Sequence, residues 1–233
     1  MPESPPTEKT INPWTVWVPI IMIMLGVVVL YNYLVLQSLE KNKDRPPYIT
    51  RLESYPGGLT ERSGKQVRLG DLKGKVMVFA HVYTSCPVGC SQIVAEMKDI
   101  YDEFAPKHAG LQFVSFAIDP ADNPERLKAY ADANDIVKDD WWFVNGDQKM
   151  IRVFLTNVVK FFAVKEKPKD QQTSEVDKFD HDMRIALIDH AGHLRGMYDI
   201  MNPDPEFRGL AKKRLRKDLG YLLADREKEL AKP

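Results

Sequence analysis

The chain has 233 residues, of which 44% are hydrophobic, and its 33 basic residues balance its 33 acidic residues to a formal net charge of zero. This length allows one medium domain with an appendage, or two small domains. The neutral balance argues against broad electrostatic binding to nucleic acid, which requires surplus lysine and arginine, so we expect no nucleic-acid partner. Only two cysteines occur, too few for a disulfide-stapled secreted scaffold, and we interpret the pair as a functional site.

A long apolar run lies near the amino terminus, at residues 14–36, and no charged residue occurs between Lys9 and Glu40. A helix of roughly 20 residues crosses the ~30 Å hydrocarbon layer of a membrane. The run therefore predicts one transmembrane helix that follows an N-terminal tail at residues 1–13. Tryptophans near one end of the run and tyrosines near the other match the aromatic belts of a membrane interface.

Two other interpretations of the apolar run are a buried core helix and a cleaved signal peptide. The length of the run and its lack of charge disfavour a core helix. A signal peptide has an apolar region of about 7–15 residues that ends in small residues, whereas this run is longer and ends in Leu34, Val35 and Leu36. The run therefore favours an uncleaved, single-pass anchor.

The charges beside the anchor give a conflicting signal for its orientation. Lys41, Lys43, Arg45 and Arg51 follow the run, and a count of positive charges would place the carboxy-terminal part in the cytoplasm. Long domains translocate largely regardless of such charges. The chemistry of the cysteines therefore decides the predicted side.

Residues 37–66 are predicted to be a polar linker, because they contain several turn-forming prolines and glycines. From residue 67 onward, strand and helix signals alternate along the chain. Strands are predicted at 76–83, 111–118 and 141–144 and as a hairpin at 183–188 and 193–198, with a charged loop at 165–178. Helices are predicted to begin at Pro87, at Pro124 after an Asn123 cap, and at Gln148, and a final helix has Phe207, Leu210, Ala211, Leu215, Leu219 and Leu222 on one face.

Alternating strands and helices imply parallel strands joined by right-handed crossovers, and the closing hairpin adds antiparallel strands. This order of elements is that of an α/β thioredoxin-like fold, which we predict for residues 67–230.

Cys86 and Cys90 follow the first predicted strand directly and enclose residues 87–89. A helix that starts at Pro87 would place Cys86 at its amino terminus, where the helix dipole favours a thiolate. Two adjacent soft thiolates suit Cu(I), whereas Zn(II) requires a closed set of four ligands and no further cysteine exists. A redox dithiol without metal is the main alternative, and a pair of inert buried cysteines is another.

Among the five histidines, His181 is the candidate third ligand, because it stands just before the strand predicted at 183–188. In thioredoxin-like folds the entrance to that strand faces the cysteine loop, and thioredoxins carry a cis-proline there. This chain has Lys178-Phe179-Asp180-His181-Asp182 instead, which weakens the oxidoreductase interpretation. A solvent-exposed loop histidine is the alternative. His81 is predicted to be a core histidine and His108 a surface histidine.

These residues resemble the SCO/SenC family of copper chaperones and thiol-disulfide proteins of cytochrome c oxidase assembly. The resemblance covers roughly residues 67–200 and rests on Thr84-Ser85-Cys86-Pro87-Val88-Gly89-Cys90, Asp119-Pro120, Asn145-Gly146-Asp147 and His181. It implies that Cys86, Cys90 and His181 bind a copper ion. It also implies that the domain faces the periplasm or the mitochondrial intermembrane space.

The resemblance implies a metallochaperone rather than an enzyme, held in the cell membrane by residues 14–36 with its soluble domain on the periplasmic side. It would deliver Cu(I) to a cytochrome c oxidase subunit that carries a copper site. The alternative is a thiol-disulfide oxidoreductase that reduces the cysteines of that site, with Cys86 and Cys90 as its redox-active pair. A peroxidase is a more distant alternative, because Phe79 stands where peroxiredoxins carry proline, seven residues before the cysteine.

Overall fold

The structure is a computed structural model that describes residues 12–43, 45–52, 55, 57–86 and 90–232. For Lys41 and Cys90 it describes the backbone alone. The chain divides into two units, Met1–Arg45 and Pro46–Pro233.

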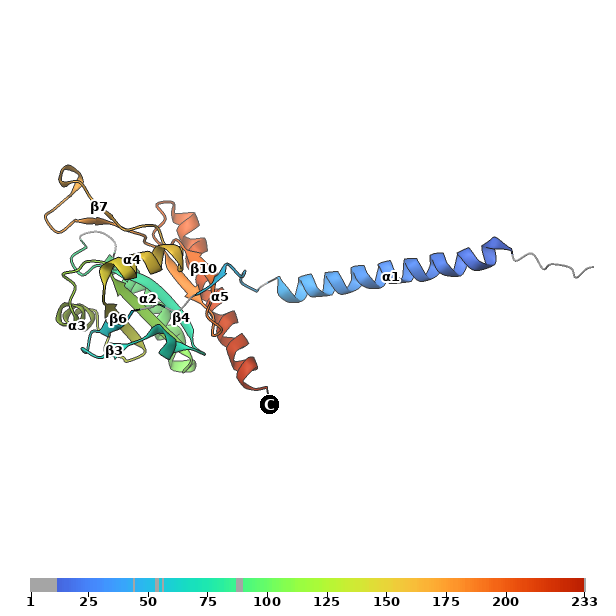
Figure 1. The fold of residues 1–233 in the computed structure, drawn as a ribbon, viewed down its shortest axis with the longest axis horizontal. Coiled ribbons are helices and arrows are strands. Elements are labelled where there is room, and N and C mark those ends of the chain that lie inside the picture. Colours follow the sequence, from blue (N-terminus) through green and yellow to red (C-terminus); the bar gives the residue numbers. More distant parts are fainter. Residues whose placement is uncertain (1–11, 44, 53–54, 56, 87–89, 233) are drawn as a thin grey trace, which may run out of the picture. The chain divides into compact units, whose positions relative to one another are not determined.

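The first unit contains one long helix, α1 (Pro13–Asn42), drawn in blue in Figure 1. The Asn12 side chain accepts a hydrogen bond from the Trp14 backbone N–H and caps the helix. Within the described chain, α1 is the helix that is long and apolar enough to cross a membrane, and protein buries none of its apolar span. Exposed apolar surface of this extent requires an apolar solvent, so α1 fits a single-pass membrane anchor.

An eight-stranded mixed sheet forms the centre of the second unit. In spatial order its strands are β1 (Thr50–Arg51), β10 (His193–Tyr198), β9 (Ile185–Ile188), β4 (Val76–Val82), β5 (Leu111–Ala117), β6 (Trp141–Asn145), β2 (Leu59–Glu61) and β3 (Gln66–Val67). Strands β4, β5 and β6 are parallel, whereas β9 runs antiparallel to β4. This arrangement confirms the predicted α/β thioredoxin-like fold.

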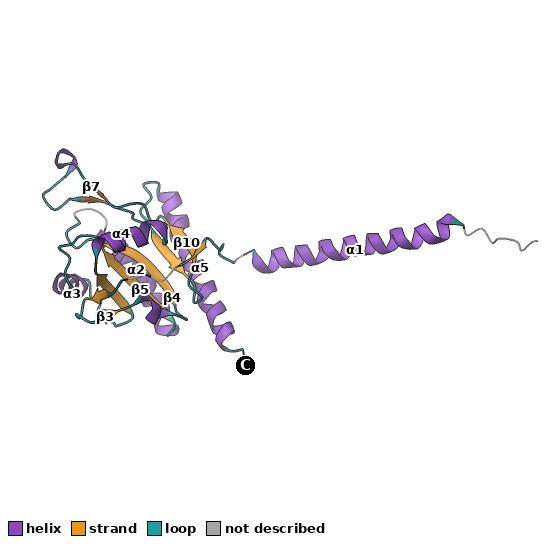
Figure 2. Ribbon diagram, viewed as in Figure 1, coloured by secondary structure: helices purple, strands orange, loops and turns teal. Residues whose placement is uncertain are grey.

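Helices cover both faces of the sheet, as Figures 1 and 2 show. One face packs against α2 (Cys90–Phe104), α3 (Pro124–Ala133) and α5 (Pro205–Leu230), and the other against α4 (Gln148–Asn157). Alternation along β4 divides the core between these faces: Val78 lies in one apolar cluster and Phe79 in the other. Every residue of β4 is buried, as expected for a strand covered on both sides.

The segment predicted to be a linker contributes to the second unit. The helix α1 continues to Asn42, and β1, β2 and β3 pair within the sheet. Tyr55 and Leu59 are buried in the core. Strands of two or three residues are too short to show a hydrophobic period. The prediction of a linker therefore rested on the turn-forming residues of this segment.

The loop predicted at 165–178 begins with a short strand, β7 (Lys165–Glu166), which pairs with β8 (Phe179–Asp180). Figure 2 shows this hairpin at one end of the second unit, away from the main sheet. The described residues also form three short 3-10 helices, η1 (Leu69–Leu72), η2 (Ala105–Lys107) and η3 (Lys169–Gln171).

The final helix buries only part of the face that the sequence predicted. Leu215, Leu219 and Leu222 are fully buried, but Phe207 and Leu210 in the first turns are exposed. The helical spacing of these residues was correct, but the apolar face is buried only from Leu215 onward.

Candidate metal centre

Strand β4 leads the chain into a turn that we call the cysteine turn, Tyr83–Cys86. The Cys86 backbone N–H donates to the Tyr83 carbonyl oxygen at 3.0 Å and closes this turn. Cys86 is partly buried and packs against an apolar cluster of Tyr83, Ile118 and Phe179. Residues 87–89, where a helix start was predicted, lie outside the described residues. The placement of Cys86 at a helix amino terminus therefore stays a prediction.

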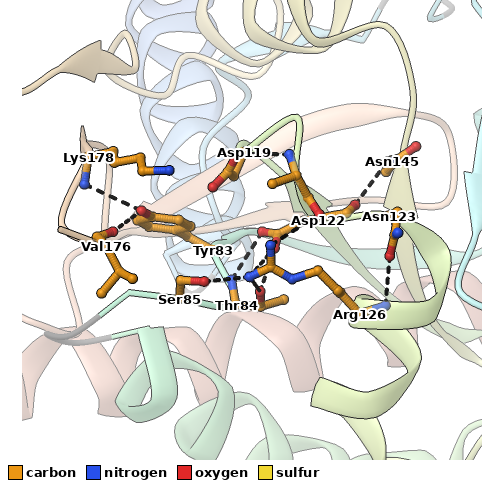
Figure 3. Close-up of polar contacts among 11 residues, drawn as sticks. Tyr83, Thr84, Ser85, Asp119, Asp122, Asn123, Arg126, Asn145, Val176 and Lys178 are labelled. Atoms are coloured by element: carbon orange, nitrogen blue, oxygen red, sulfur yellow. Dashed lines mark hydrogen bonds and ion pairs between the residues drawn. The ribbon is translucent and has the colours of Figure 1, made fainter.

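Tyr83 ties the cysteine turn to the segment that carries His181. Its hydroxyl donates to the Val176 carbonyl oxygen and accepts from the Lys178 backbone N–H at 3.3 Å, as Figure 3 shows. Its ring centroid lies 5.4 Å from that of Phe179 and 6.4 Å from that of His181. Burial raises the pKa of Tyr83, so the hydroxyl keeps the proton that it donates.

His181 directly follows β8, and its side chain is partly buried. Its Nδ1 lies 3.0 Å from the Asp182 carbonyl oxygen. Because that oxygen only accepts, this hydrogen bond requires a proton on Nδ1. Metal-ligating histidines commonly have this arrangement, in which a backbone carbonyl fixes the tautomer.

His81 lies beside His181, with 5.8 Å between the ring centroids, and is almost fully buried. Burial lowers the pKa of His81 to about 3, with a smaller contribution from the neighbouring His181, so the ring is neutral. Its Nδ1 contacts the same Asp182 carbonyl oxygen at 3.2 Å, which agrees with the predicted core histidine.

The buried Asp182 carboxylate fixes the entrance to β9. It accepts from the Arg184 side chain and from the Phe162 backbone N–H, the latter at 2.7 Å. Burial alone would raise the pKa of Asp182, but these hydrogen bonds outweigh burial and leave the pKa lowered. The guanidinium of Arg184 also lies over the Phe162 ring, 4.0 Å from its centroid. These contacts therefore hold the backbone immediately after His181 in place.

Cys86 packs against the cluster that contains Tyr83, and the His181 ring lies beside the Tyr83 ring, but the side chain of Cys90 lies outside what the structure describes. Among the described side chains, no three histidine, cysteine or acidic groups are arranged to hold a metal ion. The complete ligand set therefore stays a prediction. The chemistry of the two described donors, a thiol and an imidazole, fits copper.

A hollow of about 730 Å³ lies beside the site, on the β7–β8 hairpin. Its described lining includes Phe179 and Lys178 but neither Cys86 nor His181. The hairpin is closed by an ion pair of 2.8 Å between Lys167 and Asp177. That hydrogen bond raises the pKa of Lys167, and the nearby Cys86 makes a smaller contribution in the same direction.

Two residues that sequence analysis missed, Asp122 and Arg126, contact the cysteine turn through Thr84 and Ser85. Asp122 follows the end of β5, the parallel neighbour of β4, so polar residues after both strands meet at one edge of the sheet. The Asp119-Pro120 sequence after the predicted strand was the available signal for polar groups at this edge.

A protein-family model described as SCO1/SenC matches residues 54–214 of the chain. The SCO1 protein homolog of Bacillus subtilis (strain 168) is 30% identical over 155 residues, which are 66% of this chain and 77% of that protein. The solved structure of BsSco, described as a member of the Sco family of cytochrome c oxidase assembly proteins with a disulfide switch, is 24% identical. Its TM-score is 0.57, over 74% of this chain and 95% of BsSco. ScoI of Bradyrhizobium japonicum, solved with copper bound, is 22% identical with a TM-score of 0.53, over 67% and 96% of the two chains.

Proposed function

Because the chain belongs to the SCO1/SenC family, we propose that it is a membrane-anchored copper metallochaperone. Cys86, Cys90 and His181 bind Cu(I), and the protein delivers the ion for assembly of the copper centre of cytochrome c oxidase. The oxidase subunit that carries this centre is its partner. Support comes from the copper-bound ScoI structure and from the description of BsSco as an oxidase assembly protein.

The observation that carries this proposal is the convergence of Cys86 and His181 on Tyr83. Cys86 packs against the Tyr83 cluster, and the His181 ring lies beside the Tyr83 ring. The Asp182 carbonyl oxygen contacts Nδ1 of His181 at 3.0 Å, an arrangement that is common in metal-ligating histidines. A thiolate is a soft donor that favours Cu(I), and imidazole is a donor that copper accepts in both oxidation states.

The same cysteines support a second candidate function, a thiol-disulfide oxidoreductase. The partial exposure of Cys86 favours it, because a target disulfide needs access to the attacking sulfur. In this reaction one thiolate attacks the target disulfide and the second resolves the mixed disulfide. The target gains two electrons and two protons, and Cys86 and Cys90 end as a disulfide.

The soluble domain is proposed to lie on the periplasmic side of the membrane that α1 crosses. The motivation is functional, because the delivered copper and the oxidase copper centre must meet in one compartment. A reporter fused to the carboxy terminus, active only outside the cytoplasm, tests this side. A cytoplasmic carboxy terminus would contradict copper delivery.

The decisive experiment is competition for Cu(I) between the reduced full-length protein in detergent and a chromogenic Cu(I) chelator. We expect tight binding by the natural protein and strongly weakened binding by Cys86→Ser and by Cys90→Ser. His108→Ala is the control, because His108 lies away from the site and pairs with Glu227 at 2.7 Å. Equal binding by the natural protein and a Cys86→Ser/Cys90→Ser double variant would sink the copper proposal and favour the oxidoreductase.

A further inference from the structure

Thr84 and Ser85, the two residues before Cys86, are held by side chains outside the proposed ligand set. Figure 3 shows Asp122 and Arg126 reaching these residues from the loop after β5 and from α3. None of these four residues offers a soft donor to copper. Their contacts therefore concern the position of the turn rather than its chemistry.

Asp122 fixes Thr84 from the interior. Its carboxylate is fully buried, accepts from the Thr84 backbone N–H at 3.1 Å, and also accepts from the Thr84 hydroxyl. Its own backbone carbonyl oxygen accepts from the Asn145 side chain at 2.8 Å. Asp122 therefore joins the cysteine turn to the end of β6 as well as to the loop after β5.

Arg126 fixes Ser85 from the outer side. Its Nη2 donates to the Ser85 Oγ at 2.5 Å and to the Thr84 Oγ1 at 3.3 Å. Its Nη1 donates to the Ala121 carbonyl oxygen at 3.3 Å, and Asp122 provides a counter-charge at 3.8 Å. The fork of the guanidinium thus spans two segments of chain at once, which the single ammonium of a lysine does not do.

The position of Arg126 is itself determined by the start of α3. Asn123 caps this helix by accepting from the Arg126 backbone N–H at 2.9 Å, and Pro124 occupies its first position. Arg126 therefore leaves a rigid first turn rather than a free loop. This rigidity lets its side chain order the neighbouring cysteine turn.

The electrostatic attraction between Arg126 and Asp122 is not the main effect. The Arg126 side chain is 43% exposed, and water screens ion pairs at such positions. Geometry matters more, because the hydrogen bond to Ser85 restrains the residue that is covalently joined to Cys86. A ligand that is held in place before binding loses less conformational freedom when the metal arrives.

We propose that Arg126 is a positioning residue, which holds Ser85 and thereby orders Cys86 for Cu(I). The inference rests on the proposed function for its ligand, but the ordering of the turn does not require copper. Two measurements on the full-length protein in detergent separate these two parts. One is amide hydrogen exchange over residues 83–86 without metal, and the other is Cu(I) affinity.

Arg126→Gln and Ser85→Ala should each speed amide exchange over residues 83–86 and weaken Cu(I) binding roughly three- to tenfold, the range of one hydrogen bond. The double variant should be no weaker than Arg126→Gln alone, because both changes remove the same contact. Ser85→Thr keeps the hydroxyl and should therefore keep both the amide exchange rate and the Cu(I) affinity of the natural protein. Lys128→Gln, an exposed change on the same helix, is the control.

Unchanged amide exchange in Arg126→Gln would overturn the inference, whether or not the protein binds copper. So would losses in Cu(I) affinity that multiply in the double variant, because Arg126 and Ser85 would then act independently. Failure of the natural protein to bind Cu(I) would instead reject the proposed function, and the exchange measurement would still test the ordering of the turn.

Discussion

His81 and His181 share one hydrogen-bond acceptor, the Asp182 carbonyl oxygen, which lies 3.2 Å and 3.0 Å from their respective Nδ1 atoms. Because a carbonyl only accepts, both hydrogen bonds require a proton on Nδ1. The rings differ in access: His81 is buried against Phe161, whereas His181 is partly exposed. The two rings share one anchor on the backbone, and the partly exposed His181 is the one that we propose as a ligand.

Replacing His181 with alanine should weaken Cu(II) binding strongly and Cu(I) binding only in part. Cu(II) prefers nitrogen ligands, whereas the two thiolates are the softer donors that hold Cu(I). The reduction potential of the cysteine pair should shift little, because exchange needs only the sulfurs. Competition titrations for both ions and a redox titration on the same variant measure these effects.

His108→Ala is again the control and should leave all three quantities unchanged. Unchanged affinity for both copper ions in His181→Ala would show that His181 is not a ligand. The site would then be a bare dithiol, and the oxidoreductase would become the better proposal.

Replacing Tyr198 with phenylalanine should lower the free energy of unfolding by about 1–3 kcal/mol. The Tyr198 hydroxyl donates to the Asp218 carboxylate at 2.8 Å, and both groups are buried where β10 meets α5. The substitution leaves a buried carboxylate without one of its donors. Urea unfolding measures the loss, with Tyr48→Phe as a control because Tyr48 is exposed. Equal losses in the two variants would contradict this role of the hydroxyl.

Replacing Arg195 with alanine should be more damaging, by about 3–5 kcal/mol. The buried guanidinium pairs with Asp189 at 2.8 Å and donates to the carbonyl oxygens of Pro46 and Pro47 at the start of the second unit. Its removal takes the guanidinium from the buried Asp189 carboxylate, which keeps only its contacts with Ala191 and His193. Urea unfolding again measures the loss. Arg51→Ala, an exposed arginine on the neighbouring strand, should change stability little, and a similar loss there would argue against the buried pair.

The thermal stability of the protein should fall in acid, because the β7–β8 hairpin loses the contacts of the ionised Asp177 carboxylate. Hydrogen bonds from Lys167 and Thr173 lower the pKa of Asp177 to about 2, below its unfolded value of about 4. A carboxyl group with a lowered pKa stabilises the fold above the unfolded value and loses that contribution as pH falls through the folded value. The thermal midpoint should therefore fall between about pH 4 and pH 2, and less steeply in Asp177→Asn.

Asp170→Asn, an exposed change on the same hairpin, should keep the natural pH profile. If Asp177→Asn retains the full acid-induced loss, the Asp177 contacts are not its source.

Regular, locally encoded features were predictable from the sequence. The apolar runs identified β4 and β5, and Asn123 with Pro124 identified the start of α3, because strand burial and helix capping each depend on neighbouring residues. The contacts that hold the cysteine turn were not predictable in this way. Asp122 and Arg126 contact Thr84 and Ser85 across the sheet edge, and no period or short motif encodes such a contact.

Tertiary context also decided where the predicted patterns failed. Leu210 has the helical spacing of a core residue but is exposed, and it lines an open hollow together with residues of β10. The strands β1 to β3 exist because neighbouring strands offer them hydrogen bonds, rather than because their own sequences favour strands strongly. The candidate ligands were predictable in part. The spacing of the two cysteines is a local feature, whereas the choice of His181 depended on the expected fold.

The antiparallel pairing of β9 with β4 has a consequence for the order of events in biosynthesis. It brings the segment that carries His181 beside the end of the strand that leads to Cys86, although the two segments are far apart along the chain. Contacts of such high sequence separation form late, because the long intervening loop must close first. In a nascent chain, the two cysteines are therefore synthesised well before His181 can lie near them. The proposed three-ligand site exists only in the folded protein, so copper loading with all three ligands follows folding rather than directing it.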